Sequence, residues 1–259
     1  MIHETAVVAA EAELGHGVTI GPFTCIEPDV RIGAGCVIGP HVTILSRTTV
    51  GANGRIHAGA VLGDRPQDVH FEECDSRVEI GSDCVIREGV TIHRGSKPGS
   101  VTVIGDGCFL MGFSHFAHDV RLGSGVIVAN GALLAGFVQV GDRAFISGNA
   151  IVHQFVRIGR LAMLAGGCAV SKDVPPFCLL RPAALNDVRG TNVVGMRRAG
   201  LTAAERSDVN RAFKILYRSG LNTSQAAEEI GKAFSSGPAL EVRDFVSASE
   251  RGICGFGED

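Results

Sequence analysis

Branched aliphatic residues recur at every sixth position through the first two-thirds of the chain. Steps of six from Ile2 reach an aliphatic residue or Phe at every slot up to Val170, except at Asp68, Cys74 and Pro98. Neither a strand of period two nor a helix of period 3.6 produces a beat of six. A short strand and a tight turn, repeated on three sides, close one coil of about 18 residues. The pattern predicts a left-handed parallel β-helix, a triangular prism built from hexapeptide repeats with an aliphatic core.

The regular beat also divides the chain. We assign residues 1–174 to the prism and predict loops near 64–77 and 94–101, where the beat is broken. After Val174 it stops at two prolines, so residues 175–259 are expected to form a linker and a small α-helical C-terminal domain.

The predicted C-terminal domain carries helix signals. Thr202 and Glu205 form a capping box, and apolar residues follow it on one helical face at 209, 212, 213 and 216. Gly220 is placed to end this helix, and residues 222–234 and 239–250 predict two more.

Composition narrows the class of protein. The chain has 35 Gly and a net charge of −3, and its eight Cys include no CxxC pair, which argues against a zinc ribbon or a thioredoxin motif. No basic leader and no apolar run of about 18 residues is present, so we expect a soluble, cytoplasmic chain without a membrane span. Sparse aromatic residues and the lack of a reader motif make nucleic acid an unexpected partner.

Stacking of the coils predicts a column of histidines. Because residues 18 apart lie one above the other, His118 falls below Gly136, which lies near the level under His153. If the second loop protrudes from its coil, His93 lies one coil below His118, and His115 lies on the same edge of the prism. Imidazole exchanges protons near neutral pH, which suits a general base.

Two features bear on the chemistry of this column. Asp119 follows His118 directly and would orient its ring if the chain allowed contact, although neighbouring strand residues face opposite ways. A zinc site of the kind in hexapeptide-repeat carbonic anhydrases is the metal alternative, but its two histidines are five residues apart, whereas here they are three apart. We therefore expect no metal and no cofactor.

Basic residues concentrate after the prism. Residues 181–218 contain eight basic and three acidic side chains, and this excess of positive charge favours an anionic partner. The adjacent Arg197 and Arg198 are the better candidates for phosphate.

Seven strings together carry a family resemblance. The chain resembles the UDP-N-acetylglucosamine acyltransferases of lipid A biosynthesis over nearly its whole length, through TIHRG (91–95), HFAHD (115–119), LAGF (134–137), VHQF (152–155), KDVPPF (172–177), NVVGMRRAG (192–200) and KILYRSG (214–220).

The resemblance implies a reaction and its residues. It implies a homotrimer with sites between adjacent subunits, which transfers a 3-hydroxyacyl chain from acyl carrier protein to the 3-hydroxyl of the UDP-sugar acceptor. His118 would be the general base, Asp119 its partner and the Gly136 amide the oxyanion donor. Gly166 would set acyl length and leave room for a longer chain. The substrate positions implied are Asp68, His70, His93, His115, His153, Gln154, Gly166, Asn192 and Arg198.

Four departures from the family pattern leave the acceptor open. His70 and Phe137 stand where members of the family commonly have Lys and His. Val194 replaces a frequent acidic residue, and Ala199 stands where an Arg is usual. A 3-amino sugar nucleotide acylated on nitrogen is therefore the alternative acceptor. A trimeric scaffold that only binds acyl carrier protein is the non-catalytic alternative. The acyl chain length is not fixed by the sequence.

Overall fold

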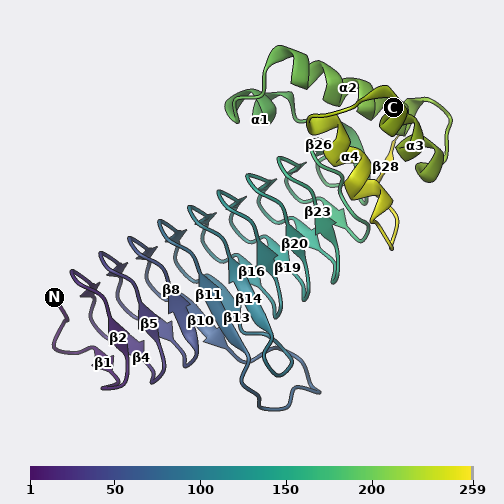
Figure 1. Cartoon of the computed structure of the whole chain (residues 1–259). Helices are drawn as coiled ribbons and strands as arrows, with labels where there is room; N and C mark the ends of the chain where they lie inside the picture. Colours follow the sequence, from purple (N-terminus) through teal and green to yellow (C-terminus); the bar gives the residue numbers. More distant parts are fainter. Residues whose placement is uncertain (258–259) are drawn as a thin grey trace.

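The computed structural model describes residues 1–257, and these fold into a long prism with helices at its C-terminal end (Figure 1). Most strands contain two residues, and the second of these is the aliphatic slot residue, which points into the core. The predicted fold class is confirmed.

The prism has three faces, and each face is a sheet of mainly parallel strands. The first face contains, in order, β1 (Val7–Val8), β4 (Cys25–Ile26), β7 (Thr43–Ile44), β10 (Val61–Asp64), β13 (Thr91–His93), β16 (His115–Phe116), β19 (Leu133–Leu134), β22 (Ile151–Val152) and β25 (Ala169–Val170). The second contains β2 (Glu13–Leu14), β5 (Arg31–Ile32), β8 (Thr48–Val50), β11 (Arg77–Ile80), β14 (Val101–Ile104), β17 (Arg121–Leu122), β20 (Gln139–Val140) and β23 (Arg157–Ile158). The third contains β3 (Thr19–Ile20), β6 (Val37–Ile38), β9 (Arg55–Ile56), β12 (Val85–Ile86), β15 (Phe109–Leu110), β18 (Ile127–Val128), β21 (Phe145–Ile146), β24 (Met163–Leu164), β26 (Cys178–Leu180), β27 (Asp187–Thr191) and β28 (Gly255–Phe256).

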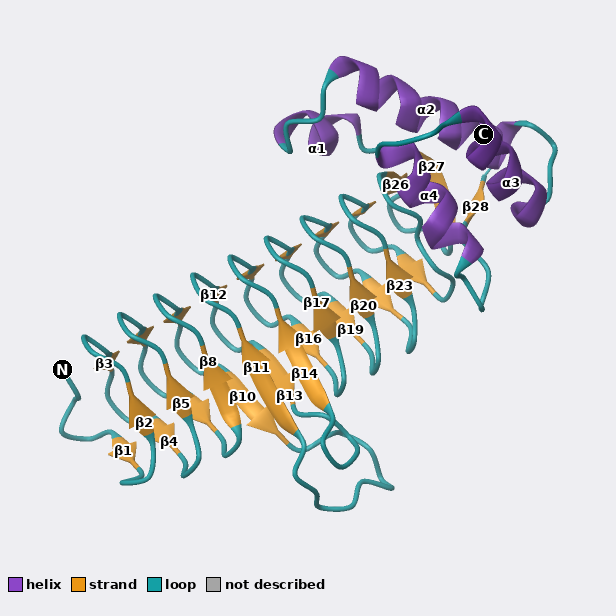
Figure 2. Cartoon of the chain, viewed as in Figure 1, coloured by secondary structure: helices purple, strands orange, loops and turns teal. Residues whose placement is uncertain are grey.

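The register of the first face carries the predicted stacking. Phe116 pairs with Leu134, and Leu134 pairs with Val152, each 18 residues further along the chain. Ile92 pairs with Phe116 across 24 residues, because the second loop is looped out of its coil. Figure 2 shows the loop between β10 and β11 protruding from one side of the prism.

The third face extends past the last regular hexapeptide. Leu179 of β26 pairs with Met163 of β24, and β27 then runs antiparallel to β26. Sheet structure therefore enters the range that we assigned to a linker and helices. Prolines 175 and 176 end the six-residue beat because they lack N–H groups, but Phe177 donates to the Arg160 carbonyl and the chain rejoins the face.

The helices are α1 (Val193–Arg198), α2 (Ala203–Arg218), α3 (Thr223–Ala233) and α4 (Pro238–Ser247). The predicted capping box of Thr202 and Glu205 is present, and Gly220 takes a positive φ just after the cap of α2. A second apolar core joins α2, α3 and α4. Helix α1 was not predicted, and it is a short helix with Asn192 as its N-cap. Residues 258 and 259 of the predicted C-terminal domain lie outside the described residues.

Side-chain hydrogen bonds attach the C-terminal part to the prism. The Arg160 guanidinium donates to both Glu241 carboxylate oxygens of α4, at 2.9 and 2.8 Å. Asp173, which is buried, accepts hydrogen bonds from the Arg157 N–H and the Ser249 hydroxyl. None of the helices in residues 1–257 is long and apolar enough to cross a membrane.

Candidate active site

His118 and Asp119 lie in the turn that follows β16. Asp119 has a φ of 61°, and the His118 Nδ1 atom lies 2.9 Å from its Oδ2 atom. The sequence alone leaves this contact open, because neighbouring residues in a strand face opposite ways. The turn removes that obstacle, so the carboxylate meets the ring of the preceding residue.

The Asp119 carboxylate is buried and held ionised. Its Oδ2 atom accepts hydrogen bonds from the Ser96 N–H at 3.0 Å and the Ser96 hydroxyl at 2.7 Å. Burial acts to raise the pKa of Asp119, but the hydrogen bonds from His118 and Ser96 outweigh it and lower the pKa to about 2. An ionised carboxylate only accepts, so in the neutral ring Nδ1 of His118 carries the proton and Nε2 is the nitrogen with a free lone pair. The Asp119 contact therefore sets which ring nitrogen of His118 can accept a proton.

Gly136 lies one coil above His118. Phe137 donates its N–H to the His118 carbonyl at 3.0 Å, and a Cβ atom on Gly136 would lie 2.5 Å from Cε1 of His118. Within residues 1–257, the Gly136 N–H has no hydrogen-bond partner. The same holds for the Gln154 N–H one coil further on, so the turn itself leaves this amide open. Gly136 differs because it has no side chain between its amide and the imidazole.

His93 lies one coil below His118, at the end of β13, and His115 lies in β16 on the same coil as His118. The ring centroids of His93 and His115 are 5.1 Å apart, and His93 is buried. The Nδ1 atom of His93 donates to the Arg65 carbonyl, and that of His115 lies 2.7 Å from the Thr91 hydroxyl. Burial, followed by the neighbouring His93, lowers the pKa of His115 to about 4. His115 is therefore neutral at pH 7.

Above His118 the column becomes aromatic. Phe137 meets the His118 ring edge to face at 5.1 Å, and Phe155 stacks on Phe137 at 4.9 Å. His153 is exposed, and its Nδ1 atom donates to the Gln154 carbonyl at 3.1 Å. Phe155 was missed, although its spacing of 18 from Phe137 is a signal for it.

Two further predicted positions lie on the first loop. Asp68 and His70 are exposed, and Asp68 accepts a hydrogen bond from the His70 N–H at 2.9 Å. The second loop reaches the site through Ser96, which contacts Asp119. No spacing pattern marks Ser96, because this contact spans a loop.

Asn192 and Arg198 lie elsewhere, at the start and the end of α1, beside the third face. They line a cavity of about 790 Å³ between that face and α1. Both polar atoms of Asn192 are engaged: its amide donates to the Leu161 carbonyl, and its oxygen accepts from the Gly195 N–H, both at 2.9 Å. A single chain therefore does not bring these two residues to His118. Asn192 acts in this chain as a helix cap.

Gly166 lies exposed in the turn after β24. A Cβ atom placed on it would come no closer than 3.7 Å to the Gly148 carbonyl, so the surface there has room for more atoms. Within residues 1–257, no group of three or more His, Cys, Asp or Glu side chains is arranged to hold a metal ion.

Two family models match the chain. A family model described as UDP N-acetylglucosamine O-acyltransferase, domain 2, matches residues 173–254. The model of the bacterial transferase hexapeptide matches residues 11–46, 29–64 and 102–136.

Curated relatives match over nearly the full length. An acyl-[acyl-carrier-protein]–UDP-N-acetylglucosamine O-acyltransferase from Syntrophobacter fumaroxidans is 42% identical over 97% of this chain and 98% of its own. The protein of the same name from Thermodesulfovibrio yellowstonii is 41% identical, with 98% of each chain covered.

A solved structure agrees with these relatives. A UDP-N-acetylglucosamine acyltransferase from Campylobacter jejuni has a TM-score of 0.94 and 37% identity, covering 99% of this chain and all of its own. The similarity therefore includes both the prism and the helices.

Proposed function

The chain belongs to the UDP-N-acetylglucosamine O-acyltransferase family, and from that premise we propose that it transfers a 3-hydroxyacyl chain from acyl carrier protein to the 3-hydroxyl of UDP-N-acetylglucosamine, with His118 as general base. The observation that carries the proposal is the adjacency of three groups. The Nε2 atom of His118 has a lone pair, Asp119 holds the opposite nitrogen, and the open amide of Gly136 lies against the same ring.

The proposed reaction uses each of these groups once. Nε2 of His118 takes the proton of the sugar hydroxyl as its oxygen attacks the thioester carbonyl carbon. The N–H of Gly136 donates to the oxyanion that forms, and Asp119 stabilises the imidazolium. The carbon–sulfur bond then breaks, the sulfur leaves as the thiol of the carrier protein with the proton from His118, and the sugar keeps the acyl chain as an ester.

We further propose that the working unit is a homotrimer. Asn192 and Arg198 belong to α1 and its N-cap, beside the third face, whereas His118 lies at the corner between the first and second faces. A neighbouring copy would bring its third face to this corner and complete the site. Within that site Asp68, His70, His93, His115, His153 and Gln154 would contact substrate, and Gly166 would limit the acyl chain.

The partners and the compartment follow from the same proposal. The basic residues between 181 and 218 favour an anionic partner, and we propose that they receive acyl carrier protein. All eight cysteines are free, which suits a reducing cytoplasm.

The experiment is an acyl-transfer assay read by mass spectrometry. Purified protein is given a ladder of 3-hydroxyacyl carrier proteins with UDP-N-acetylglucosamine and its 3-amino analogue, side by side. Transfer to the hydroxyl supports the proposal, and His118→Ala should lower turnover by about 10²–10⁴ while binding of the carrier protein persists. Transfer only to the amine would change the acceptor, and transfer to neither would favour a binding scaffold.

A further inference from the structure

The loop between β10 and β11 has little structure of its own. Its internal hydrogen bonds are short-range ones, such as those from the Phe71 and His70 N–H groups to Asp68. Asp68 and His70 are nevertheless the positions on it that would contact substrate in the proposed function, and His70 is one of the four positions on which the acceptor depends. The loop therefore needs anchors outside itself if these side chains are to be held in one place.

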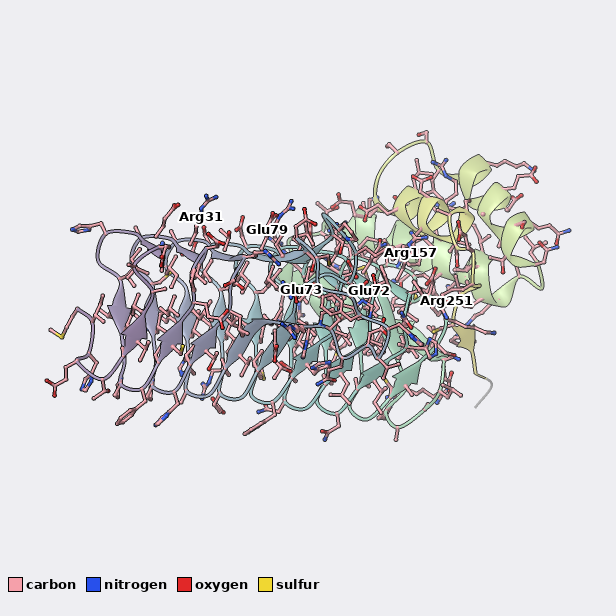
Figure 3. The ribbon with its side chains drawn as sticks, turned by 90° about the horizontal axis from the view of Figure 1, so that it is seen from below. Arg31, Glu72, Glu73, Glu79, Arg157 and Arg251 are labelled. Atoms are coloured by element: carbon pink, nitrogen blue, oxygen red, sulfur yellow. The ribbon has the colours of Figure 1, made fainter. Side chains whose placement is uncertain are left out.

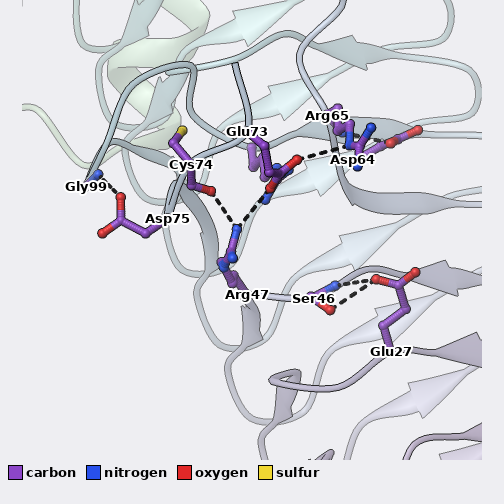
Figure 4. A network of polar contacts seen from close by, with 10 residues as sticks. Glu27, Ser46, Arg47, Asp64, Arg65, Glu73, Cys74, Asp75 and Gly99 are labelled. Carbon is purple, nitrogen blue, oxygen red and sulfur yellow. Dashed lines mark hydrogen bonds and ion pairs between the residues drawn. The ribbon is translucent and has the colours of Figure 1, made fainter. Parts of the chain in front are cut away.

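Glu73 provides the main anchor, and Figure 4 shows it between Arg47 and Arg65. Its two carboxylate oxygens accept hydrogen bonds from the Arg94 guanidinium at 2.6 and 2.8 Å. The Arg47 guanidinium lies 3.2 Å from the same carboxylate, and so does that of Arg65. The four residues come from the turn before β8, the loop itself and the end of β13. One carboxylate thus joins three separate segments.

Arg94 depends on this carboxylate more than the other two arginines. Its side chain is 7% exposed, against 39% for Arg47 and 71% for Arg65. Its Nε atom is buried and has no hydrogen-bond partner in residues 1–257. Removal of the Glu73 charge would leave a buried guanidinium without its counter-ion, whereas the other two would stay hydrated.

The anchor is continuous with the histidine column. Arg94 follows His93 directly, and its N–H donates to the Asp64 carbonyl at 2.9 Å. His93 donates from its ring to the carbonyl of Arg65, one of the arginines on Glu73. The orientation of His93 and the start of the loop are therefore fixed by the same group of contacts.

We infer that Glu73 is a positioning residue for the sugar-nucleotide acceptor: through Arg47, Arg65 and Arg94 it holds the loop so that Asp68, His70 and His93 face the substrate together. This inference rests on the proposed function. It touches neither His118 nor Gly136, so it concerns acceptor binding and leaves the acyl-transfer step alone.

The chain supplies a matched control. Glu72 is the preceding residue on the same loop, is exposed, and makes no ion pair with any described residue (Figure 3). Glu72→Gln and Glu73→Gln change the charge of the loop equally, so a difference between them reports the arginine contacts.

The test measures steady-state kinetics of the full chain with UDP-N-acetylglucosamine varied and the acyl carrier protein saturating. Glu73→Gln should raise KM for the sugar nucleotide about tenfold and change kcat less than about threefold, and Glu73→Asp should fall between it and the wild type. Hydrogen exchange of residues 64–77 should be faster in Glu73→Gln than in Glu72→Gln.

Each contrary outcome has a separate meaning. Equal KM values for the two Gln variants, with an active wild type, would overturn the positioning role and leave the proposed function standing. A loss of kcat at unchanged KM would also overturn it. Wild-type protein that acylates no UDP-N-acetylglucosamine would overturn the proposed function and this inference together. If Glu73→Gln does not fold, Glu73→Asp, which keeps the charge and shortens its reach, is compared with Glu72→Asp in its place.

Discussion

The Nε2 atom of His118 lies 2.6 Å from the position that a Cβ atom on Gly136 would occupy. Real Cβ contacts are longer than 3.0 Å, so any side chain at this position displaces the imidazole from the open amide.

Gly136→Ala should therefore separate the proposed general base, His118, from the proposed oxyanion donor. We expect kcat to fall by about 10²–10³, the loss typical for an oxyanion contact, with little change in melting temperature because the His118 side chain can rotate away. The control is Gly255→Ala, since a Cβ atom there meets nothing within 4 Å. Full activity in Gly136→Ala would argue against both assigned roles.

Acid should destabilise the protein through His115. Its pKa in the folded chain is about 4, below the ordinary 6.5, so the unfolded chain binds more protons between these values and stability falls as pH drops from 6.5 toward 4. His115→Asn should remove roughly 2 kcal/mol of this loss after allowance for solvent screening. Urea denaturation of both proteins at pH 7 and pH 4.5 measures the difference. Parallel losses in the two proteins would assign the acid sensitivity to other groups.

Asp119 acts at lower pH. Its folded pKa of about 2 lies below the ordinary 3.8, so its contribution to stability is present above 3.8 and is lost as pH falls through about 2. Asp119→Asn should therefore flatten the stability curve between pH 4 and 2, as followed by circular dichroism. A curve as steep as that of the wild type would show that the Ser96 and His118 contacts do not control this carboxyl.

Asn192 should prove structural as well as functional. Its side chain caps α1 and also donates to the Leu161 carbonyl, so Asn192→Ala should destabilise the chain by about 1–2 kcal/mol. Thr202→Ala removes a cap from α2 in an exposed position and should cost about 1 kcal/mol. Chemical denaturation compares them. If Asn192→Ala retains wild-type stability, its capping contacts contribute little.

A shared site predicts complementation between two inactive variants. If His118 and Arg198 act together from different chains, His118→Ala and Arg198→Ala are each weak alone, yet mixed trimers contain some sites with both residues intact. Co-expression with two affinity tags isolates such mixtures, and their turnover should exceed that of either parent. Turnover no higher than the parents would place both residues in one chain's site or exclude the trimer.

The sequence was informative wherever a spacing rule applied. The six-residue beat predicted the three faces, and the spacing of 18 placed Gly136 over His118. With the second loop outside its coil, the same stacking predicted the column from His93 to His153. These contacts are set by the repeating backbone and do not depend on side-chain conformation.

The contacts that sequence could not give depend on loops and turns. Ser96 reaches Asp119 across a loop whose path no periodicity describes, and Asp119 meets His118 through a turn with a positive φ. Glu73 and its arginines come from three separated segments, so no local motif marks them. The position of Asn192 beside another face was hidden for the same reason.

In the first coils, up to Ile44, each described strand pairs with strands of the coils directly below and above it. Val7 pairs with Cys25, and Cys25 with Thr43, so removal of one complete 18-residue coil from this stretch would rejoin the same three faces in register. The coils before Arg47 are thus modular, and the length of the prism can change there by whole coils during evolution or design while His118, Asp119 and Gly136 keep their geometry.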